Sequence, residues 1–167
     1  QQTTSPASRT IDGSGLNAFD EHGTDLKTMW ATPVGLPAWI QYTFDREYML
    51  DQMWVWNANS ELELFMGFGA KDVVVEYSLD GATWTKLENV PQFSKATGTA
   101  AYTANTTVDF HGAVAKYIRL TVSSNWGGIS PQTGLSEVRF FYVPAQPREP
   151  QPADAATGVN VETALTW

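Results

Sequence analysis

The chain contains 167 residues with a formal net charge of −8; 43% of the residues are hydrophobic, 17% are charged and none is cysteine. This composition is sufficient for one domain of ordinary size with a buried core, and it excludes disulfide bonds, thiolate metal sites and cysteine catalysis. The negative charge, with no cluster of Lys and Arg to oppose it, argues against a nucleic-acid partner, and no apolar run is long enough to insert into a membrane.

Short β-like segments separated by turn signals follow one another from Ile11 to about Val143, after a polar lead-in over residues 1–10. The clearest is 73–78 (VVVEYS), and Asp80–Gly81 directly after it indicates a hairpin turn. No window keeps a helical period over ten residues. Strands are therefore expected over residues 39–44, 50–57, 73–78, 83–87, 106–110, 116–122 and 137–143. This spacing is typical of an antiparallel β-sandwich.

The composition changes after Val143, which marks a domain boundary. Residues 144–154 (PAQPREPQPAD) are rich in proline, and this favours a stiff, extended linker. We interpret residues 1–143 as one domain and residues 155–167 as the truncated start of a following β domain. The alternative is that 155–167 folds back on the first domain as an edge strand. A domain followed by such a linker indicates a protein with several modules.

Catalytic motifs are absent from the sequence. The two histidines, His22 and His111, lie in no HExxH pattern, and neither a GxSxG motif nor a phosphate-binding loop occurs. Glu61 and Glu63 are two residues apart, and we interpret them as part of a solvated loop instead of a glycosidase pair. With no nucleophile and base that belong together, we expect a protein that is not an enzyme.

The segment 11–30 (IDGSGLNAFDEHGTDLKTMW) is rich in Asp, Gly, Ser and Asn and poor in strand signal. Calcium is bound by about six to eight oxygen atoms from carboxylates and backbone carbonyls, which such a loop can supply. Composition alone is a weak indication, since most loops of this kind are simply turns.

Aromatic residues are abundant, with seven Trp, six Tyr and eight Phe. Trp54 and Trp56 are two apart and share one face of a strand, and Trp84 is expected to pack over its hairpin. Trp126 differs because it lies in a loop, 123–130 (SSNWGGIS), between two good strands. It either stacks on a ligand, with the amide of Asn125 beside it for hydroxyl groups, or folds back over the end of the sandwich. The sequence leaves both open.

Four pieces of sequence, in order and with regular spacing, resemble one known family. They are Asp12–Gly13 with Thr28–Trp30 (DG…TMW), Trp39–Phe44 (WIQYTF), Val73–Trp84 (VVVEYSLDGATW), and Lys116–Leu120 with Gly134–Val138 (KYIRL…GLSEV). The chain over residues 11–143 is thus similar to the discoidin-like domains, also called F5/8 type C domains, which include the family 32 carbohydrate-binding modules. The resemblance implies an all-β, antiparallel jelly-roll β-sandwich of about eight strands.

The resemblance also implies one structural calcium ion, bound by Asp12, Thr28 and Glu137 together with backbone carbonyls. Such an ion would join the opening loop to the last strand. The long insert between Asp12 and Thr28 departs from the family pattern and leaves open which oxygens bind the ion: Asp12 alone, Asp25 from the insert in its place, or both. The alternative without a metal is a salt bridge from Glu137 to Arg9 or Arg139.

Sugar-binding members of this family use loops at one end of the sandwich, with an aromatic platform and polar side chains. The matching positions here are Trp126, Asn125, Asn57, Asn59, Phe65, Phe68 and His22, the last from the insert. The loop 92–105 is expected to form a further wall.

The sequence as a whole predicts a non-catalytic carbohydrate-binding module of a secreted, multimodular protein, located outside the cell or at its surface. We expect a monomer that binds a polysaccharide or other glycan and one calcium ion, with no nucleic-acid partner. Two alternatives are a module that binds proteins or mediates adhesion, and a structural spacer without a ligand.

Overall fold

The protein is described here by a computed structural model, which covers residues 5–32, 35–128 and 132–144. Over these residues the fold is all-β with three short helices. The strands are β1 (Trp30–Ala31), β2 (Ala38–Asn57), β3 (Val73–Ser78), β4 (Thr85–Lys86), β5 (Thr106–Asp109), β6 (Val114–Val122) and β7 (Gly134–Tyr142). The helices are η1 (Ala7–Thr10), η2 (Leu26–Thr28) and α1 (Glu63–Met66). The predicted linker and the start of a following domain, residues 145–167, lie outside the described residues.

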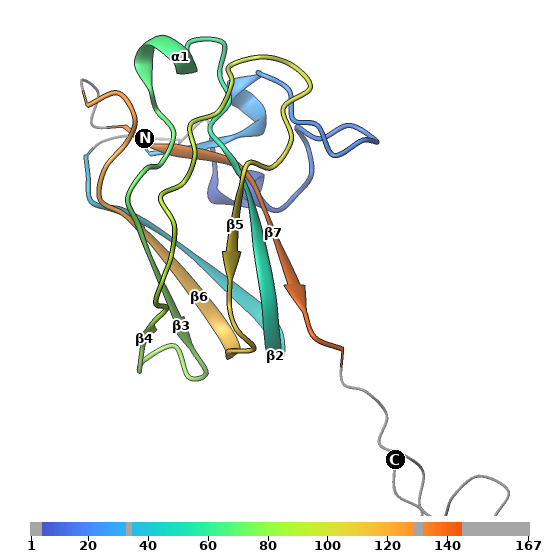
Figure 1. Ribbon diagram of the computed structural model, residues 1–167, viewed down its shortest axis with the longest axis vertical. Coiled ribbons are helices and arrows are strands. Elements are labelled where there is room, and N and C mark those ends of the chain that lie inside the picture. Colours follow the sequence, from blue (N-terminus) through green and yellow to red (C-terminus); the bar gives the residue numbers. More distant parts are fainter. Residues whose placement is uncertain (1–4, 33–34, 129–131, 145–167) are drawn as a thin grey trace, which may run out of the picture.

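The strands form one sheet that curls on itself, in the order β1-β7-β2-β6-β3-β4, with β5 paired to β2 (Figure 1). Every pairing between these strands is antiparallel. The first part of β2, Ala38 to Met49, pairs with β6, whereas its second part, Leu50 to Asn57, pairs with β7 and β5. The curl gives two layers that share β2, so the predicted antiparallel β-sandwich is confirmed.

Two segments that we expected to be separate strands, 39–44 and 50–57, are one strand in the structure. The polar stretch between them, around Asp45, looks like a turn in the sequence. The chain instead stays extended and absorbs the irregularity as a register shift between Thr43 and Tyr48. Such a bulge changes the direction of a strand without ending it. β2 passes into the other layer after Met49, where its partner changes from β6 to β7.

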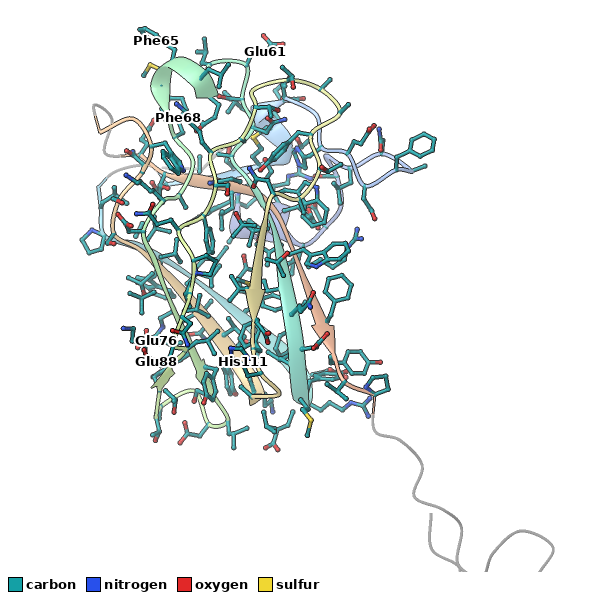
Figure 2. All side chains as sticks on the ribbon, viewed as in Figure 1. Glu61, Phe65, Phe68, Glu76, Glu88 and His111 are labelled. Atoms are coloured by element: carbon teal, nitrogen blue, oxygen red, sulfur yellow. The ribbon has the colours of Figure 1, made fainter. Side chains whose placement is uncertain are left out.

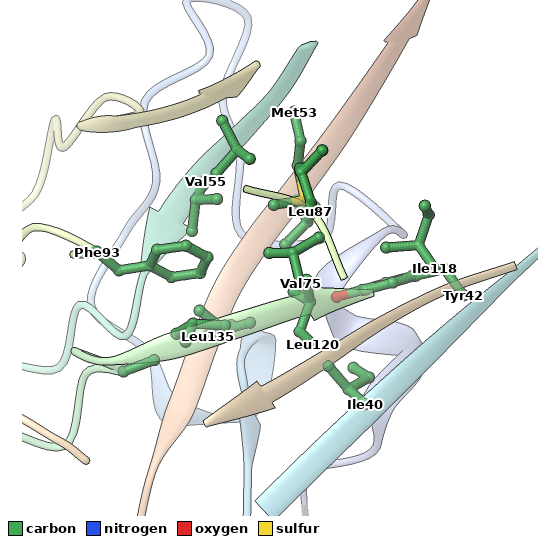
Figure 3. Close-up of a cluster of buried hydrophobic side chains, with 14 of the residues drawn as sticks. Ile40, Tyr42, Met53, Val55, Val75, Leu87, Phe93, Ile118, Leu120 and Leu135 are labelled. Atoms are coloured by element: carbon green, nitrogen blue, oxygen red, sulfur yellow. The ribbon is translucent and has the colours of Figure 1, made fainter. Parts of the chain in front are cut away.

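The core lies between the two layers and follows the alternation of the strands. Ile40 and Tyr42 of β2 are buried while Trp39 and Gln41 between them are exposed, as period-two strands require. From the other layer Val55 packs toward this face, as the buried cluster in Figure 3 shows. Each fully buried side chain of this size contributes about 1.5–3 kcal/mol relative to exposure, so the alternation fixes which face of each strand points inward.

The predicted hairpin after β3 forms as expected. Asp80 accepts hydrogen bonds from the backbone N–H groups of Ala82 and Thr83 at 2.8 and 2.7 Å, and Gly81 has a φ of 75°. These backbone hydrogen bonds hold the pKa of Asp80 well below its usual range. The guanidinium of Arg119 lies 3.8 Å from the ring centre of Trp84, so this Trp covers a neighbouring strand.

The long loops gather at one end of the sandwich, together with α1, while the β3–β4 hairpin lies at the other (Figure 1). In the described portion of the chain, no helix is long and apolar enough to cross a membrane. The end that carries α1 contains most of the side chains that the sequence selects as ligand-binding candidates.

Candidate functional site

The loop 61–66 presents an apolar surface at this end of the molecule. Phe65 is 80% exposed, and Leu62 and Leu64 beside it are exposed as well. Figure 2 shows Phe65 at the outer tip of α1. Phe65 is among the residues predicted from the sequence to bind a ligand, whereas Leu62 and Leu64 are not, although the Glu-Leu-Glu-Leu repeat puts apolar side chains into a segment without a strand partner.

Glu63 holds this loop from inside. Its side chain is completely buried, and its two carboxylate oxygens accept hydrogen bonds from the backbone N–H groups of Phe68 and Gly69, at 2.9 and 3.0 Å. Burial raises the pKa of Glu63 to about 6. The inward anchor explains why Leu64 and Phe65, on the next positions of a single helical turn, point outward.

Trp126 folds back against the loop end. Its indole N–H donates to the carbonyl of Phe93 at 2.9 Å, and its backbone N–H donates to Gly69 at 3.2 Å. The ammonium of Lys71 lies 4.9 Å from the centre of its ring. The side chain is half-buried, so part of the ring remains accessible beside a cation. This is the folded-back arrangement of the two that the sequence left open.

The loop of Trp126 is joined closely to α1. Gly127 donates to the carbonyl of Gly67 at 2.9 Å, and a Cβ on Gly127 would lie 1.8 Å from the carbonyl oxygen of Met66. Gly67 itself has a φ of 63°, the left-handed conformation that ends a helix and favours glycine. The close approach of the two backbones brings the loop of Phe65 and the loop of Trp126 together.

The structure corrects the expectation that Asn57 and Asn59 face a sugar, because both are completely buried. Asn57 donates to the carbonyls of Ala70 and Ser94. Asn59 donates to the carbonyls of His22, Gly23 and Thr99, and accepts from the N–H of Gly98. Backbone groups in buried loops have no neighbouring strand to bond with. The side-chain amides of Asn57 and Asn59 supply the hydrogen bonds that these backbone groups need.

The same correction applies to Asn125 and His22. Asn125 is buried, donates to the carbonyl of Gln132 at 2.7 Å and accepts from Gly127 and Gly128. The ring of His22 is completely buried, and its Nδ1 lies 2.8 Å from the carbonyl oxygen of Gly23. Burial lowers the pKa of His22. The sequence of a glycine-rich loop does not show whether a polar side chain within it points outward to solvent or inward to the protein.

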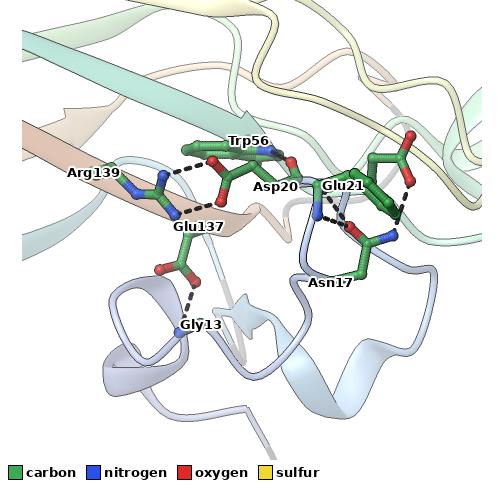
Figure 4. A network of polar contacts seen from close by, with 8 residues as sticks. Gly13, Asn17, Asp20, Glu21, Trp56, Glu137 and Arg139 are labelled. Atoms are coloured by element: carbon green, nitrogen blue, oxygen red, sulfur yellow. Dashed lines mark hydrogen bonds and ion pairs between the residues drawn. The ribbon is translucent and has the colours of Figure 1, made fainter.

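A second feature is the carboxylate of Glu137 on β7 (Figure 4). It is 4% exposed and accepts a hydrogen bond from the backbone N–H of Gly13 at 3.3 Å. The alternative of a salt bridge is not observed: Arg139 pairs with Asp20 at 2.8 Å and Arg9 pairs with Asp12 at 3.1 Å. Within the described ranges Glu137 therefore has no ion-pair partner.

The electrostatic state of Glu137 follows from this environment. Burial, and to a smaller extent the negative charge of Asp12, raise the pKa of Glu137 to about 7. The charge of Asp12 therefore acts on Glu137, while the Asp12 carboxylate itself pairs with Arg9 at 3.1 Å. A buried carboxylate near a second negative charge is unfavourable unless a proton or a cation compensates it.

The other two predicted metal ligands are engaged in the turn of η2. Thr28 donates its hydroxyl proton to the carbonyl of Asp25 at 2.7 Å, and the Asp25 carboxylate accepts from the N–H of Lys27 at 2.9 Å. Asp25 is exposed. No group of three or more His, Asp or Glu side chains in the described part of the chain is placed to hold one metal ion. Further ligands would have to be hydroxyl or carbonyl oxygens.

The residues considered for catalysis do not come together. His111 lies at the end of the molecule opposite Glu61 and Phe65 (Figure 2). Its nearest acid is Asp109, 3.3 Å away, and both side chains are largely exposed.

Comparison with known proteins identifies relatives of this chain. The family model of the F5/8 type C domain matches residues 2–133 of the chain. No curated protein matches the sequence.

Solved structures match over most of the chain. The module CpGH89CBM32-5 from Clostridium perfringens, solved with GalNAc-β-1,3-galactose, has a TM-score of 0.60 and 16% identity, over 82% of this chain and 84% of that one. The family 32 module of Clostridium perfringens NanJ, solved with galactose, has a TM-score of 0.59 and 14% identity, covering 84% and 87%. The CBM32 of AlyQ, solved with 4,5-unsaturated mannuronic acid, has a TM-score of 0.54 and 20% identity, covering 81% and 85%. At these identities the likeness concerns the fold.

Proposed function

Because the chain belongs to the F5/8 type C domain family, we propose that it is a non-catalytic carbohydrate-binding module that binds glycan at the end of the sandwich carrying α1. Modules of the same fold, solved with galactose and with GalNAc-β-1,3-galactose, support the ligand class. A protein of net charge −8 is suited to neutral sugars more than to anionic polymers.

The observation that carries this proposal is the exposure of Phe65. A large aromatic ring that is 80% exposed and flanked by Leu62 and Leu64 forms an apolar surface that water solvates poorly. The apolar face of a sugar ring covers such a platform, and aromatic rings contribute much of the binding energy at interfaces. The half-buried ring of Trp126 belongs to the adjoining loop, whose backbone is hydrogen-bonded to the end of α1.

A matched pair of variants tests the platform. Phe19 is 81% exposed, much like Phe65, but it lies in the insert and far from α1 in sequence. Retention on polysaccharide gels and binding to a glycan array should be lost in Phe65→Ala and kept in Phe19→Ala. Equal binding by both variants, or no binding of any glycan by the native chain, would contradict the proposal.

We further propose that a calcium ion binds between Asp12 and Glu137, with the Thr28 hydroxyl and backbone carbonyls as further ligands. The residues fit a hard cation, since Glu137 is a buried carboxylate without an ion-pair partner in the described part of the chain, and the negative charge of Asp12 acts on it. The ion would supply the compensating positive charge and hold the opening loop on β7. Asp25, capping η2, is a less suitable ligand.

A protein-binding or adhesion module is the second candidate, and the aliphatic side chains of Leu62 and Leu64 favour it. Aliphatic groups beside an aromatic one are typical of the buried centre of a protein interface. This candidate would be supported if the native chain binds a protein partner but no glycan, and if the Leu64→Ser variant no longer binds that partner. For either function we propose a secreted, multimodular protein acting outside the cell or at its surface.

A further inference from the structure

The position of Phe65 depends on α1, which is a single turn of helix over Glu63–Met66 (Figure 1). The first turn of a helix fixes several backbone angles for very few hydrogen bonds, so one turn is not stable by itself. The turn closes where the N–H of Gly67 donates to the carbonyl of Glu63 at 2.8 Å. Other parts of the chain must therefore hold α1 in place if Phe65 is to keep one position.

The carbonyl of Leu64 is left without its helical partner. In a continuing helix it would accept from the N–H four residues further on, which belongs to Phe68. That N–H donates instead to the side-chain carboxylate of Glu63, at 2.9 Å. The helix thus ends after one turn, and a carbonyl at the end of a helix needs a partner from outside it.

Lys95, in the loop 92–105, supplies this partner. Its ammonium group donates to the Leu64 carbonyl at 3.1 Å, across 31 positions of the sequence. Lysine side chains near the C-terminal end of a helix commonly bond its last carbonyls in this way. The contact joins the loop 92–105 directly to the turn that carries Phe65.

The backbone around Lys95 is itself fixed. Phe93 and Ala96, on either side of it, are buried. The carbonyl of Lys95 accepts a hydrogen bond from the side-chain amide of Asn105 at 2.9 Å. Only the Lys95 side chain has to be ordered for the contact with α1, so the entropic cost is that of one side chain and not of a loop.

Glu63 and Lys95 hold the turn from opposite sides. The Glu63 carboxylate is completely buried, whereas the Lys95 side chain is half-buried. Burial raises the pKa of Glu63, and the positive charge of Lys95 counteracts part of that rise. Lys95 therefore favours the ionised carboxylate, the form in which both oxygens accept from backbone N–H groups.

We propose that Lys95 is a positioning residue of the glycan-binding surface, which holds α1 so that the Phe65 ring is presented to the ligand. The inference rests on the proposed function for the role of Phe65. It adds the loop 92–105 to the segments on which binding depends, as a support for α1. The role of Lys95 is to fix α1, and direct contact with the sugar is a different role that the test distinguishes.

Hydrogen exchange of the backbone amides, followed by NMR without any ligand, tests the proposal. Lys95→Met keeps an unbranched side chain and removes the ammonium group. The amides of Gly67 and Phe68 should then exchange about two- to tenfold faster, as expected for the loss of one hydrogen bond. Exchange in β6 should be unchanged. Lys95→Arg, which keeps a charged donor, should return the rates toward the native ones.

Lys86→Met is the matched control, because Lys86 is exposed on β4, in the hairpin at the other end of the sandwich (Figure 1). It removes the same charge and should leave the exchange of Gly67 and Phe68 at the native rate. Retention on the polysaccharide gels used for Phe65→Ala is the second measurement. It should fall about two- to tenfold in Lys95→Met and be kept in Lys95→Arg and Lys86→Met.

The outcomes separate this inference from the proposed function. Unchanged exchange of Gly67 and Phe68 in Lys95→Met, or an equal rise in β6, would overturn the inference. Weaker retention with unchanged exchange would also overturn it, since Lys95 would then contact the sugar itself. Glycan binding that depends on Phe65 would stand in each case. Faster exchange confined to α1 and reversed in Lys95→Arg supports the hold of Lys95 on α1 even if no gel retains the native chain, a result that would contradict the proposed function alone.

Discussion

Glu137 and Gly13, 124 residues apart in the sequence, are joined by a hydrogen bond of 3.3 Å from the backbone N–H of Gly13 to the Glu137 carboxylate. The contact ties the opening loop to β7, the last strand. The Glu137 carboxylate has no arginine partner within the described residues, because Arg9 and Arg139 pair with other acids. A cation at this place would therefore act on the closure of the whole domain.

Calcium should raise the melting temperature of the protein, because an ion that binds only the folded state stabilises it by mass action. At a free concentration of 100 times the dissociation constant, the gain is about 2.7 kcal/mol. Differential scanning calorimetry with calcium and with excess chelator measures it. The gain should vanish in Glu137→Gln and persist in Glu88→Gln, whose exposed side chain lies at the opposite end (Figure 2). A melting temperature that is the same with calcium and with excess chelator would contradict the proposed calcium site.

Without calcium, stability should fall as the pH rises. The pKa of Glu137 is about 7 in the folded protein against a usual value of 4.5, so the folded state binds the proton more tightly. The stabilising contribution of the protonated form is complete below about pH 4.5 and is lost as the pH passes 7, a change of about 3 kcal/mol. Glu63, with a pKa of about 6, acts in the same direction.

Urea unfolding in chelator at pH 5 and pH 8 measures this dependence. Glu137→Gln should reduce the difference between the two pH values, since an amide does not titrate. Calcium should also reduce it by favouring the carboxylate at pH 8. Stability that rises with pH in chelator would show that Glu137 is already compensated in the folded state.

Asn59→Ala should destabilise the fold by about 3 kcal/mol, because it leaves several buried backbone groups without partners. The amide of Asn59 donates to three carbonyls in two loops and accepts from the N–H of Gly98. The same substitution at Asn17, an exposed residue, should cost less than about 1 kcal/mol. Urea denaturation curves compare the two, and equal costs would speak against a structural role for the Asn59 amide.

Gly127→Ala should separate the loop of Trp126 from α1. The new Cβ would lie 1.8 Å from the carbonyl oxygen of Met66, a backbone atom, so a segment of chain has to move. We expect a loss of about 1–3 kcal/mol and weaker glycan retention. Gly23→Ala is the matched control, because its nearest non-neighbouring atom lies 3.9 Å away. If both variants bind and unfold alike, the two loops are not coupled.

The alternation of apolar and polar residues was sufficient to predict most of the strands. Alternation over 73–78 and 116–122 marks strands that the structure contains as β3 and β6, because one face of each is buried. It failed at Asp45, where a polar segment continues β2 through a register shift. It also missed α1, since a single turn of helix anchored by one buried carboxylate has no period to detect.

The residues of the candidate site were harder to predict from the sequence than the strands. Asp12 and Glu137 were selected from the family motifs, and in the structure the charge of Asp12 acts on the buried Glu137 carboxylate. The prediction that Asn57 and Asn59 face a ligand was wrong, because both side chains are buried. Composition alone does not distinguish an amide that contacts a ligand from one that donates to buried carbonyls.

The course of β2 has a mechanical consequence. Since the same 20-residue strand pairs with β6 along its first part and with β7 along its second, neither layer can detach while the other stays whole. The domain should consequently rupture in a single event when it is stretched, without a half-unfolded plateau.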